Sequence, residues 1–243
     1  MKAPSLVPAL GALLLLAACS GDGDRPAVVL VGDSIAEETS SYLGDRLGDG
    51  ELRAAVFGGT APCDWLDEGL DVTSDQIAVV SFTGNSLTPC MSDDSGGHLR
   101  GQALVDKYRA DLAALLEVFT SQGARVLVVG QPQRGPRAGG GGEGDLEVAG
   151  INATYVTLAD IQGVSFVDAG AAVETADGAF TVTLPCLPEE PGCGPDGTAP
   201  VRNDDGVHLC PGPPELACPA YASGAFRFAD AIADAIAELR AQG

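Results

Sequence analysis

Short runs of branched apolar residues alternate along this chain with stretches of helical periodicity. Each run is apolar at nearly every position, which is typical of parallel strands covered on both faces. We predict five such strands, at residues 27–31, 52–57, 77–82, 126–129 and 164–167. The apolar residues between them recur at helical spacing, as Leu104, Tyr108 and Leu112 do. We predict helices at about residues 36–47, 104–119, 146–161 and 228–239.

Alternating strands and helices indicate an α/β fold. We therefore predict one three-layer α/β/α domain with a central parallel sheet of about five strands, in a flavodoxin-like arrangement. Two segments lack an apolar period. Residues 131–145 are rich in glycine and predict a mobile loop, which could cover a site through Arg134 and Arg137 or be disordered surface. Residues 185–219 are rich in Pro, Gly and Cys and predict an irregular, disulfide-tied segment.

The first residues resemble a bacterial lipoprotein signal. A basic residue, a short apolar segment and small residues precede Cys19. We expect cleavage before Cys19 and a lipid on its sulfur; the alternative is a plain secretory signal with an incidental cysteine. The expected organisation is a signal peptide at 1–18, a lipidated tether at 19–25 and one folded domain at 26–243. The expected location is extracytoplasmic, with a lipid anchor in the bacterial cell membrane.

The formal net charge of −21 disfavours binding to nucleic acid or to an anionic membrane surface through charge. A neutral or cationic substrate fits this surface better than a polyanion. The chain contains no coiled-coil stretch, and we expect a monomer that contacts the membrane only through the lipid on Cys19.

Beyond Cys19, the chain has an even number of cysteines, as an oxidising compartment favours. They are Cys63, Cys90, Cys186, Cys193, Cys210 and Cys218. Our hypothesis pairs them in chain order, because the last two pairs close short loops and the first joins neighbouring strand ends. A zinc site is the rival interpretation, but the sequence has no CxxC pair, and we expect neither a metal nor a cofactor.

Polar residues that can do chemistry follow the predicted strands. Ser34 comes directly after the first strand, where its hydroxyl would be exposed and its backbone N–H would lie at a helix N-terminus. Such a serine can supply a nucleophile and an oxyanion donor, although Asp and Ser are also ordinary helix caps. Gly58-Gly59 follows the second strand and Asn85 follows the third. Near the C-terminus, Asp205 and His208 precede the last helix.

In this order, the four blocks resemble the motifs of the SGNH hydrolases, the GDSL-type esterases. The resemblance implies that Ser34 is the nucleophile, His208 the general base and Asp205 the group that orients the imidazole. It also implies an oxyanion hole formed by the backbone N–H groups of Ser34 and Gly59 and the side-chain amide of Asn85. Gly58 is the alternative to Gly59, and the sequence does not decide between them.

Two features refine this resemblance. The third block of the family usually reads Gly-x-Asn-Asp, whereas this chain has Thr83 in the first place and Ser86 in the last. Residues 59–65 and 84–91 look similar to extracytoplasmic SGNH domains, some of which lie beside membrane acyltransferase domains that modify cell-surface glycans. This favours acyl esters on carbohydrate as substrate.

The chain's other histidine, His98, lies in a polar segment and is expected to be exposed.

The resulting hypothesis is an extracytoplasmic serine ester hydrolase that forms an acyl-enzyme on Ser34, with a carbohydrate or small-molecule O-acyl ester as substrate. One alternative is an acyltransferase on cell-surface glycans. The other is a substrate-binding lipoprotein of the same fold without turnover.

Overall fold

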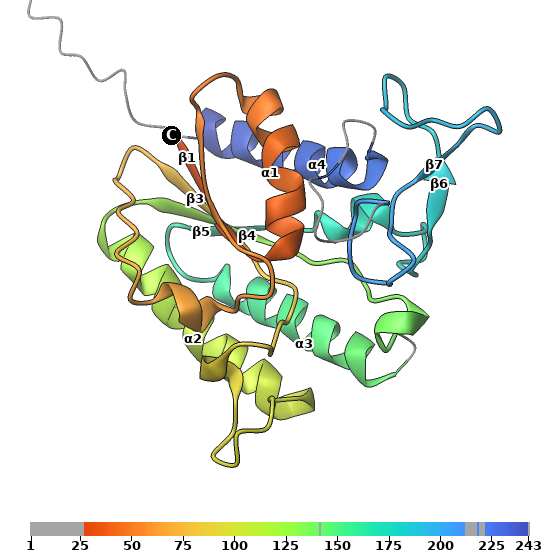
Figure 1. The fold of residues 1–243 in the computed structure, drawn as a ribbon. Helices are drawn as coiled ribbons and strands as arrows, with labels where there is room; N and C mark the ends of the chain where they lie inside the picture. The colour runs from red at the N-terminus through yellow and green to blue at the C-terminus, as the bar shows by residue number, and fades with distance from the viewer. Residues whose placement is uncertain (1–26, 141, 212–217, 219–221, 243) are drawn as a thin grey trace, which may run out of the picture.

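The computed structural model describes residues 27–140, 142–211, 218 and 222–242 (Figure 1). The predicted signal peptide, Cys19 and the tether lie outside these residues. The strands and helices are β1 (Val28–Gly32), α1 (Ser34–Leu47), β2 (Leu52–Val56), β3 (Ile77–Ser81), α2 (Gly101–Ser121), β4 (Arg125–Val129), α3 (Glu143–Leu158), β5 (Val164–Val167), β6 (Thr183–Pro185), β7 (Thr198–Pro200) and α4 (Ser223–Ala241). Short 3-10 turns are η1 (Pro62–Trp65), η2 (Pro89–Met91), η3 (Pro136–Ala138) and η4 (Gly170–Val173).

The central sheet has five parallel strands in the order β2-β1-β3-β4-β5, which confirms the predicted fold class. Strand β1 lies between β2 and β3, and its last residue, Gly32, pairs with Val56 on one side and Ser81 on the other. The strand order reverses direction at β1. In open α/β sheets, ligands bind at such a reversal, outside the carboxyl ends of the strands.

Each face of the sheet has its own core. Val28 and Leu30 of β1 pack in a cluster with residues of α1 and α4, whereas Val29 and Val31 pack with residues of α2 and α3. Figure 1 shows α1 and α4 together on one side of the sheet and α2 and α3 on the other. All four of these β1 side chains are fully buried. The run of branched residues is therefore explained by two covered faces.

The segment 185–219 is less irregular than predicted. Strand β6 pairs antiparallel with β7 to form a small hairpin outside the main sheet, and the disulfide Cys186–Cys193 closes its loop. The other two disulfides join Cys63 to Cys90 and Cys210 to Cys218, so the predicted pairing is confirmed.

The prediction of a mobile loop at 131–145 is wrong for its described residues. The N–H of Gly135 donates to the carbonyl of Gly206 at 2.7 Å, and α3 already begins at Glu143. A Cβ on Gly140 would lie 2.0 Å from the carbonyl oxygen of Arg134, so this glycine permits a close backbone contact. The glycines here permit close packing of the backbone rather than conformational freedom.

None of the helices in the described part of the chain is both long and apolar enough to cross a bilayer.

Candidate active site

Ser34 lies where strand β1 turns into helix α1. Asp33 caps the helix by accepting the N–H of Ile35 at 3.2 Å, and Ser34 is the first helical residue. Gly32 must lack a side chain, because a Cβ there would lie 2.2 Å from the carbonyl oxygen of Ser81 on the next strand. The motif thus puts the serine hydroxyl at a strand end and its N–H among the unpaired donors of the first helical turn.

His208 and Asp205 meet Ser34 from the other end of the chain. Nε2 of His208 lies 3.0 Å from Oγ of Ser34, and Nδ1 lies 2.6 Å from Oδ2 of Asp205. Burial opposes ionisation of Asp205, but hydrogen bonds from the N–H groups of Val207 and His208 and from the imidazole hold its pKa below the ordinary value. An ionised carboxylate only accepts, so Nδ1 carries the proton and the lone pair of Nε2 faces the serine hydroxyl. Serine and base are placed for proton transfer.

The carboxylate of Asp33 joins the ends of β1 and β3. Its Oδ2 accepts the N–H and the hydroxyl of Thr83, both at 2.7 Å, and Nδ2 of Asn85 at 2.9 Å. Asp33 is fully buried, which raises its pKa, while every one of its hydrogen-bond partners is a donor that favours the ionised form. The amide of Asn85 has a second N–H, so the bond to Asp33 orients this side chain without using up its donors.

Thr83 explains one departure from the family pattern. Its hydroxyl supplies a donor to Asp33 that the more usual glycine lacks. A fully buried carboxylate requires several hydrogen bonds, and Thr83 provides two of them.

The turn after β2 lies against Ser34. A Cβ built on Gly58 would lie 3.6 Å from Cβ of Ser34, and the N–H of Gly58 donates to Oε2 of Glu37 at 3.0 Å. The N–H of Gly58 is therefore committed to a carboxylate, which favours Gly59 as the donor from this turn. Gly59 has φ +82°, a backbone conformation that suits glycine. Its role in the oxyanion hole stays a prediction.

Glu38, one helical turn after Ser34, holds the segment that follows His208. Its Oε2 accepts the N–H of Leu209 at 2.7 Å and that of Cys210 at 3.4 Å. The side chain is 8 % exposed, and burial raises its pKa to about 7, against the lowering effect of the Leu209 hydrogen bond and of His208 nearby. The helix that carries Ser34 thus also fixes the backbone beside His208.

Two arginines fasten the segment 131–140 to both sides of the site. Arg202 is 2 % exposed; it donates to the carbonyl of Gln133 at 2.9 Å and to that of Val207 at 2.9 Å. Burial lowers the pKa of Arg202 to about 10, so it remains a cation at neutral pH. Arg134 donates to the carbonyl of Gly84, next to Asn85, at 3.1 Å.

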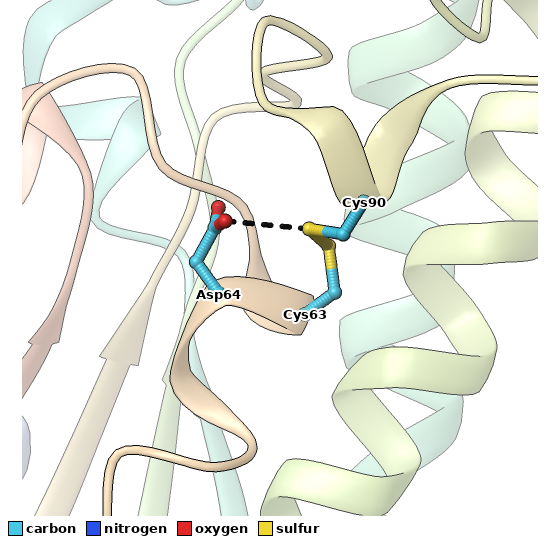
Figure 2. Close-up of side chains that lie close together, drawn as sticks. All are labelled: Cys63, Asp64 and Cys90. Carbon is cyan, nitrogen blue, oxygen red and sulfur yellow. Dashed lines mark hydrogen bonds between the residues drawn. A yellow bond between two sulfur atoms is a disulfide. The ribbon is translucent and has the colours of Figure 1, made fainter. Parts of the chain in front are cut away.

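One cluster with the spacing of metal ligands occurs in the described residues: Cys63, Asp64 and Cys90. Figure 2 shows the two cysteines joined by a disulfide, with the Asp64 carboxylate beside it. Oδ1 of Asp64 lies 3.3 Å from Sγ of Cys90, but a disulfide sulfur carries no proton to donate. Because thiolates, not disulfides, bind zinc, this group ties η1 to η2 rather than forming the zinc site considered above.

Sequence reasoning brought together Ser34, His208 and Asp205, and the structure places all three in one chain of contacts. The sequence analysis assigned no supporting role to Asp33, Glu38, Thr83 or Arg202, and it named Arg134 only as part of a loop that could cover the site. A signal existed for Asp33, which belongs to the Gly-Asp-Ser motif, and for Glu38, an acid on the same helical face as Ser34. His98 is exposed, as expected.

Residues 60–216 match the profile of the protein family described as "Protein of unknown function (DUF459)". The chain belongs to this family. A comparison with curated protein sequences found no match.

Solved structures confirm the predicted resemblance at the level of the fold. A GDSL-like lipase from Bacteroides thetaiotaomicron superposes with a TM-score of 0.57 and 15 % identity, over 89 % of each chain. The C-terminal catalytic domain of peptidoglycan O-acetyltransferase A from Streptococcus pneumoniae gives 0.54 and 16 %, over 90 % of this chain and 96 % of that one. An acetyl xylan esterase gives 0.56 and 17 %, over 86 % and 98 %. This member of the family thus has the SGNH fold.

Proposed function

We propose that this chain is a serine ester hydrolase of the SGNH type, acting through an acyl-enzyme on Ser34. The observation that carries the proposal is the Ser34–His208–Asp205 contact chain, with distances of 3.0 and 2.6 Å, at the carboxyl end of β1. Solved proteins of similar fold support it, because they are named as a lipase, an O-acetyltransferase and an esterase. A serine hydroxyl is a weak nucleophile, and a neighbouring base is what makes it reactive.

In the proposed first half-reaction, Oγ of Ser34 attacks the ester carbonyl while Nε2 of His208 takes its proton. The carbonyl oxygen becomes an oxyanion, for which the N–H groups of Ser34 and Gly59 and the amide of Asn85 are the donors. Collapse breaks the bond to the alcohol oxygen, and His208 returns the proton to that alcohol. Water then attacks the acyl-serine with the same base and releases the acid.

Asp205 and Asp33 have different tasks in this mechanism. Asp205 keeps the proton of the imidazole on Nδ1 and stabilises the imidazolium that forms when His208 accepts a second proton. Asp33 touches neither Ser34's hydroxyl nor the imidazole in the contacts described; it positions Asn85.

The test is labelling of a protein that starts after Cys19 with a fluorophosphonate, followed by intact-mass analysis and peptide mapping. We expect one adduct on Ser34, and none in Ser34→Ala or His208→Ala. His98→Ala is the matched control, because this exposed histidine lies far from the contact chain in sequence, and it should label like the parent. Absence of an adduct in a folded, disulfide-bonded sample would favour the substrate-binding alternative instead.

The location proposed is the outer side of the bacterial cell membrane, with a lipid on Cys19. The three disulfides support an oxidising compartment. Radiolabelled palmitate should enter the full chain expressed in a bacterium and not its Cys19→Ala variant. Equal incorporation into both would remove the anchor proposal.

A second candidate activity is acyl transfer, because a domain of the same fold is named as a peptidoglycan O-acetyltransferase. Here a sugar hydroxyl would replace water in the second half-reaction, with the same bonds formed and broken at Ser34. Product analysis with an acetyl donor separates the two activities. Free acetate in the presence of an acceptor sugar indicates hydrolysis, and acetylated acceptor indicates transfer.

A further inference from the structure

A cleft of about 400 Å³ lies beside the proposed active site. It is formed by the segment 131–140, the first turn of α3 and the turn that precedes Phe180. Its walls include Gln133, Arg134, Gly140, Asp145, Ala179 and Phe180. The proposed mechanism uses none of these residues.

Hydrogen bonds place this cleft next to both halves of the site. Arg134 donates to the carbonyl of Gly84, the residue before Asn85, at 3.1 Å. Gly135, between two wall residues, donates to the carbonyl of Gly206, which lies between Asp205 and His208, at 2.7 Å. The segment that forms one wall of the cleft is therefore bonded to the residue before Asn85 and to the turn that carries Asp205 and His208.

The electrostatics of the cleft favour a neutral ligand. Arg134 would attract an anion, but Oε2 of Glu147 lies 3.1 Å from its Nη1 and balances its charge. Asp145 adds a carboxylate to the wall. With a net charge of −21 on the whole chain, a phosphate or carboxylate ligand would be repelled rather than held.

Among the polar atoms of the wall residues, Oε1 of Gln133, an acceptor, and Nε of Arg134, a donor, are buried without a hydrogen-bond partner. An unsatisfied buried polar atom destabilises the fold, and a ligand that supplies the missing partner removes this cost. A hydroxyl group is both a donor and an acceptor, which are the two partners that these atoms lack.

Phe180 contributes an apolar surface to the same cleft. The guanidinium of Arg202 lies 5.0 Å from the centre of its ring, and Gly135 packs so closely that a Cβ there would lie 2.6 Å from Cζ. The ring is thereby fixed in place. An aromatic surface beside amide and guanidinium groups suits a ligand that has both C–H faces and hydroxyl edges.

We propose that this cleft binds the alcohol part of the ester, and that this alcohol is a neutral, hydroxyl-rich ring of the sugar class. The inference rests on the proposed function, because it assigns the leaving group of that reaction. His208 returns its proton to the leaving alcohol, so the alcohol lies beside the His208 turn, to which the wall segment of the cleft is hydrogen-bonded through Gly135. The volume is at the lower end of ligand pockets, which suits one or two sugar rings rather than a polymer core.

The test compares two acetate esters that differ in the alcohol: methyl 6-O-acetylglucoside, which keeps three free hydroxyls, and 4-nitrophenyl acetate. Ala179 is exposed in the cleft wall, and Ala179→Trp fills it. We expect the ratio of kcat/KM for the sugar ester to that for the aryl ester to fall about tenfold or more. Ala176→Trp, in the same turn but outside this cleft, is the matched control and should leave the ratio unchanged.

Gln133→Leu provides a second variant of similar size. Replacing an amide whose buried oxygen has no partner should leave the melting temperature unchanged or raise it. The sugar-to-aryl ratio should still fall, because the acceptor for a hydroxyl is gone. A lower melting temperature together with an unchanged ratio would assign Gln133 to packing alone. That result and an unchanged ratio in Ala179→Trp would both overturn the proposal.

Binding separates failure of this proposal from failure of the proposed function. Ser34→Ala is titrated with methyl 6-O-acetylglucoside by saturation-transfer NMR, with and without Ala179→Trp. Saturation that is lost on filling the cleft supports the subsite even if the parent hydrolyses neither ester. No saturation, or saturation that Ala179→Trp leaves intact, refutes the subsite while a fluorophosphonate adduct on Ser34 would keep the esterase proposal.

Discussion

Two buried carboxylates flank Ser34 in sequence, and they hold the two halves of the site in different ways. Asp33 anchors the Asn85 side, with three donors on one oxygen and a fourth on the other. Glu38 anchors the His208 side through two backbone N–H groups on one oxygen. The start of helix α1 thus carries Ser34 together with the two anchoring carboxylates, Asp33 and Glu38.

The difference lies in how completely each charge is compensated. Burial raises the pKa of both groups, but Asp33 accepts more hydrogen bonds, among them one from a hydroxyl placed for the purpose. Glu38 has fewer donors, and its pKa of about 7 makes it titrate near neutral pH. We infer that the oxyanion side is fixed, whereas the base side is sensitive to pH and to substitution.

The largest effect is expected when the base side loses its orienting acid. Asp205→Asn replaces the acceptor for Nδ1–H and favours the wrong tautomer of His208, so kcat should fall by about 10⁴-fold with little change in the fold. Steady-state kinetics with 4-nitrophenyl acetate and circular dichroism check this. A loss of less than about tenfold would mean that Asp205 does not orient the imidazole.

Asp33→Asn tests the opposite side. Whichever way the new amide turns, its NH₂ faces a donor, either Thr83 or the N–H of Ile35. We expect unfolding free energy to fall by about 1–3 kcal/mol. Because Asn85 loses its carboxylate acceptor in either orientation, kcat should fall by up to about 10²-fold, the loss of one oxyanion donor.

Thr83→Val is the matched control, since it removes a single donor to the same carboxylate. It should cost about 1 kcal/mol in urea unfolding and leave most of kcat. If the two variants lose kcat equally, the proposed link from Asp33 through Asn85 is wrong.

Glu38→Gln sharpens the contrast in pH dependence. A pKa raised from 4.5 to about 7 means that the folded state binds the proton more tightly than the unfolded chain. Stability from this group is therefore full below pH 4.5 and is lost as pH rises to about 7, by roughly 3 kcal/mol. The stability of the parent relative to Glu38→Gln should fall across this window, measured by urea unfolding at pH 4.5, 6 and 8. A constant difference would show that Glu38 titrates normally.

The smallest effect concerns the choice between Gly58 and Gly59. Glu37→Ala frees the N–H of Gly58 from its carboxylate. If Gly59 is the donor, kcat should change by no more than a few-fold, because the neighbouring turn only loses a surface hydrogen bond. A clear rise in kcat would instead identify Gly58 as a donor that Glu37 occupies in the resting enzyme.

Much of the architecture follows from local sequence. Fully apolar strands such as residues 28–31 predict their own burial, and the Gly-Asp-Ser motif predicts Ser34 at a helix start. The disulfide pairing could be proposed because its partners close short loops or join adjacent strand ends.

What sequence could not supply was contact between distant segments. The glycine-rich segment looked mobile because nothing local shows that Gly135 bonds to Gly206 or that Arg202 bonds to Gln133. Likewise, no pattern in α1 shows that Glu38 accepts hydrogen bonds from the N–H groups of Leu209 and Cys210, which lie 171 and 172 positions further along the chain. The residues that support this site act through tertiary contacts, and the spacing of apolar residues along the chain carries no information about such contacts.

The separation of Ser34 from His208 also affects the order in which activity arises. The two residues are 174 positions apart, and α1 packs with α4 in one core cluster. During synthesis from the N-terminus, Ser34 leaves the ribosome long before His208 exists. Under the proposed mechanism, a nascent chain therefore has a serine but no base to activate it, and reactivity begins only when the last part of the polypeptide has docked onto the first.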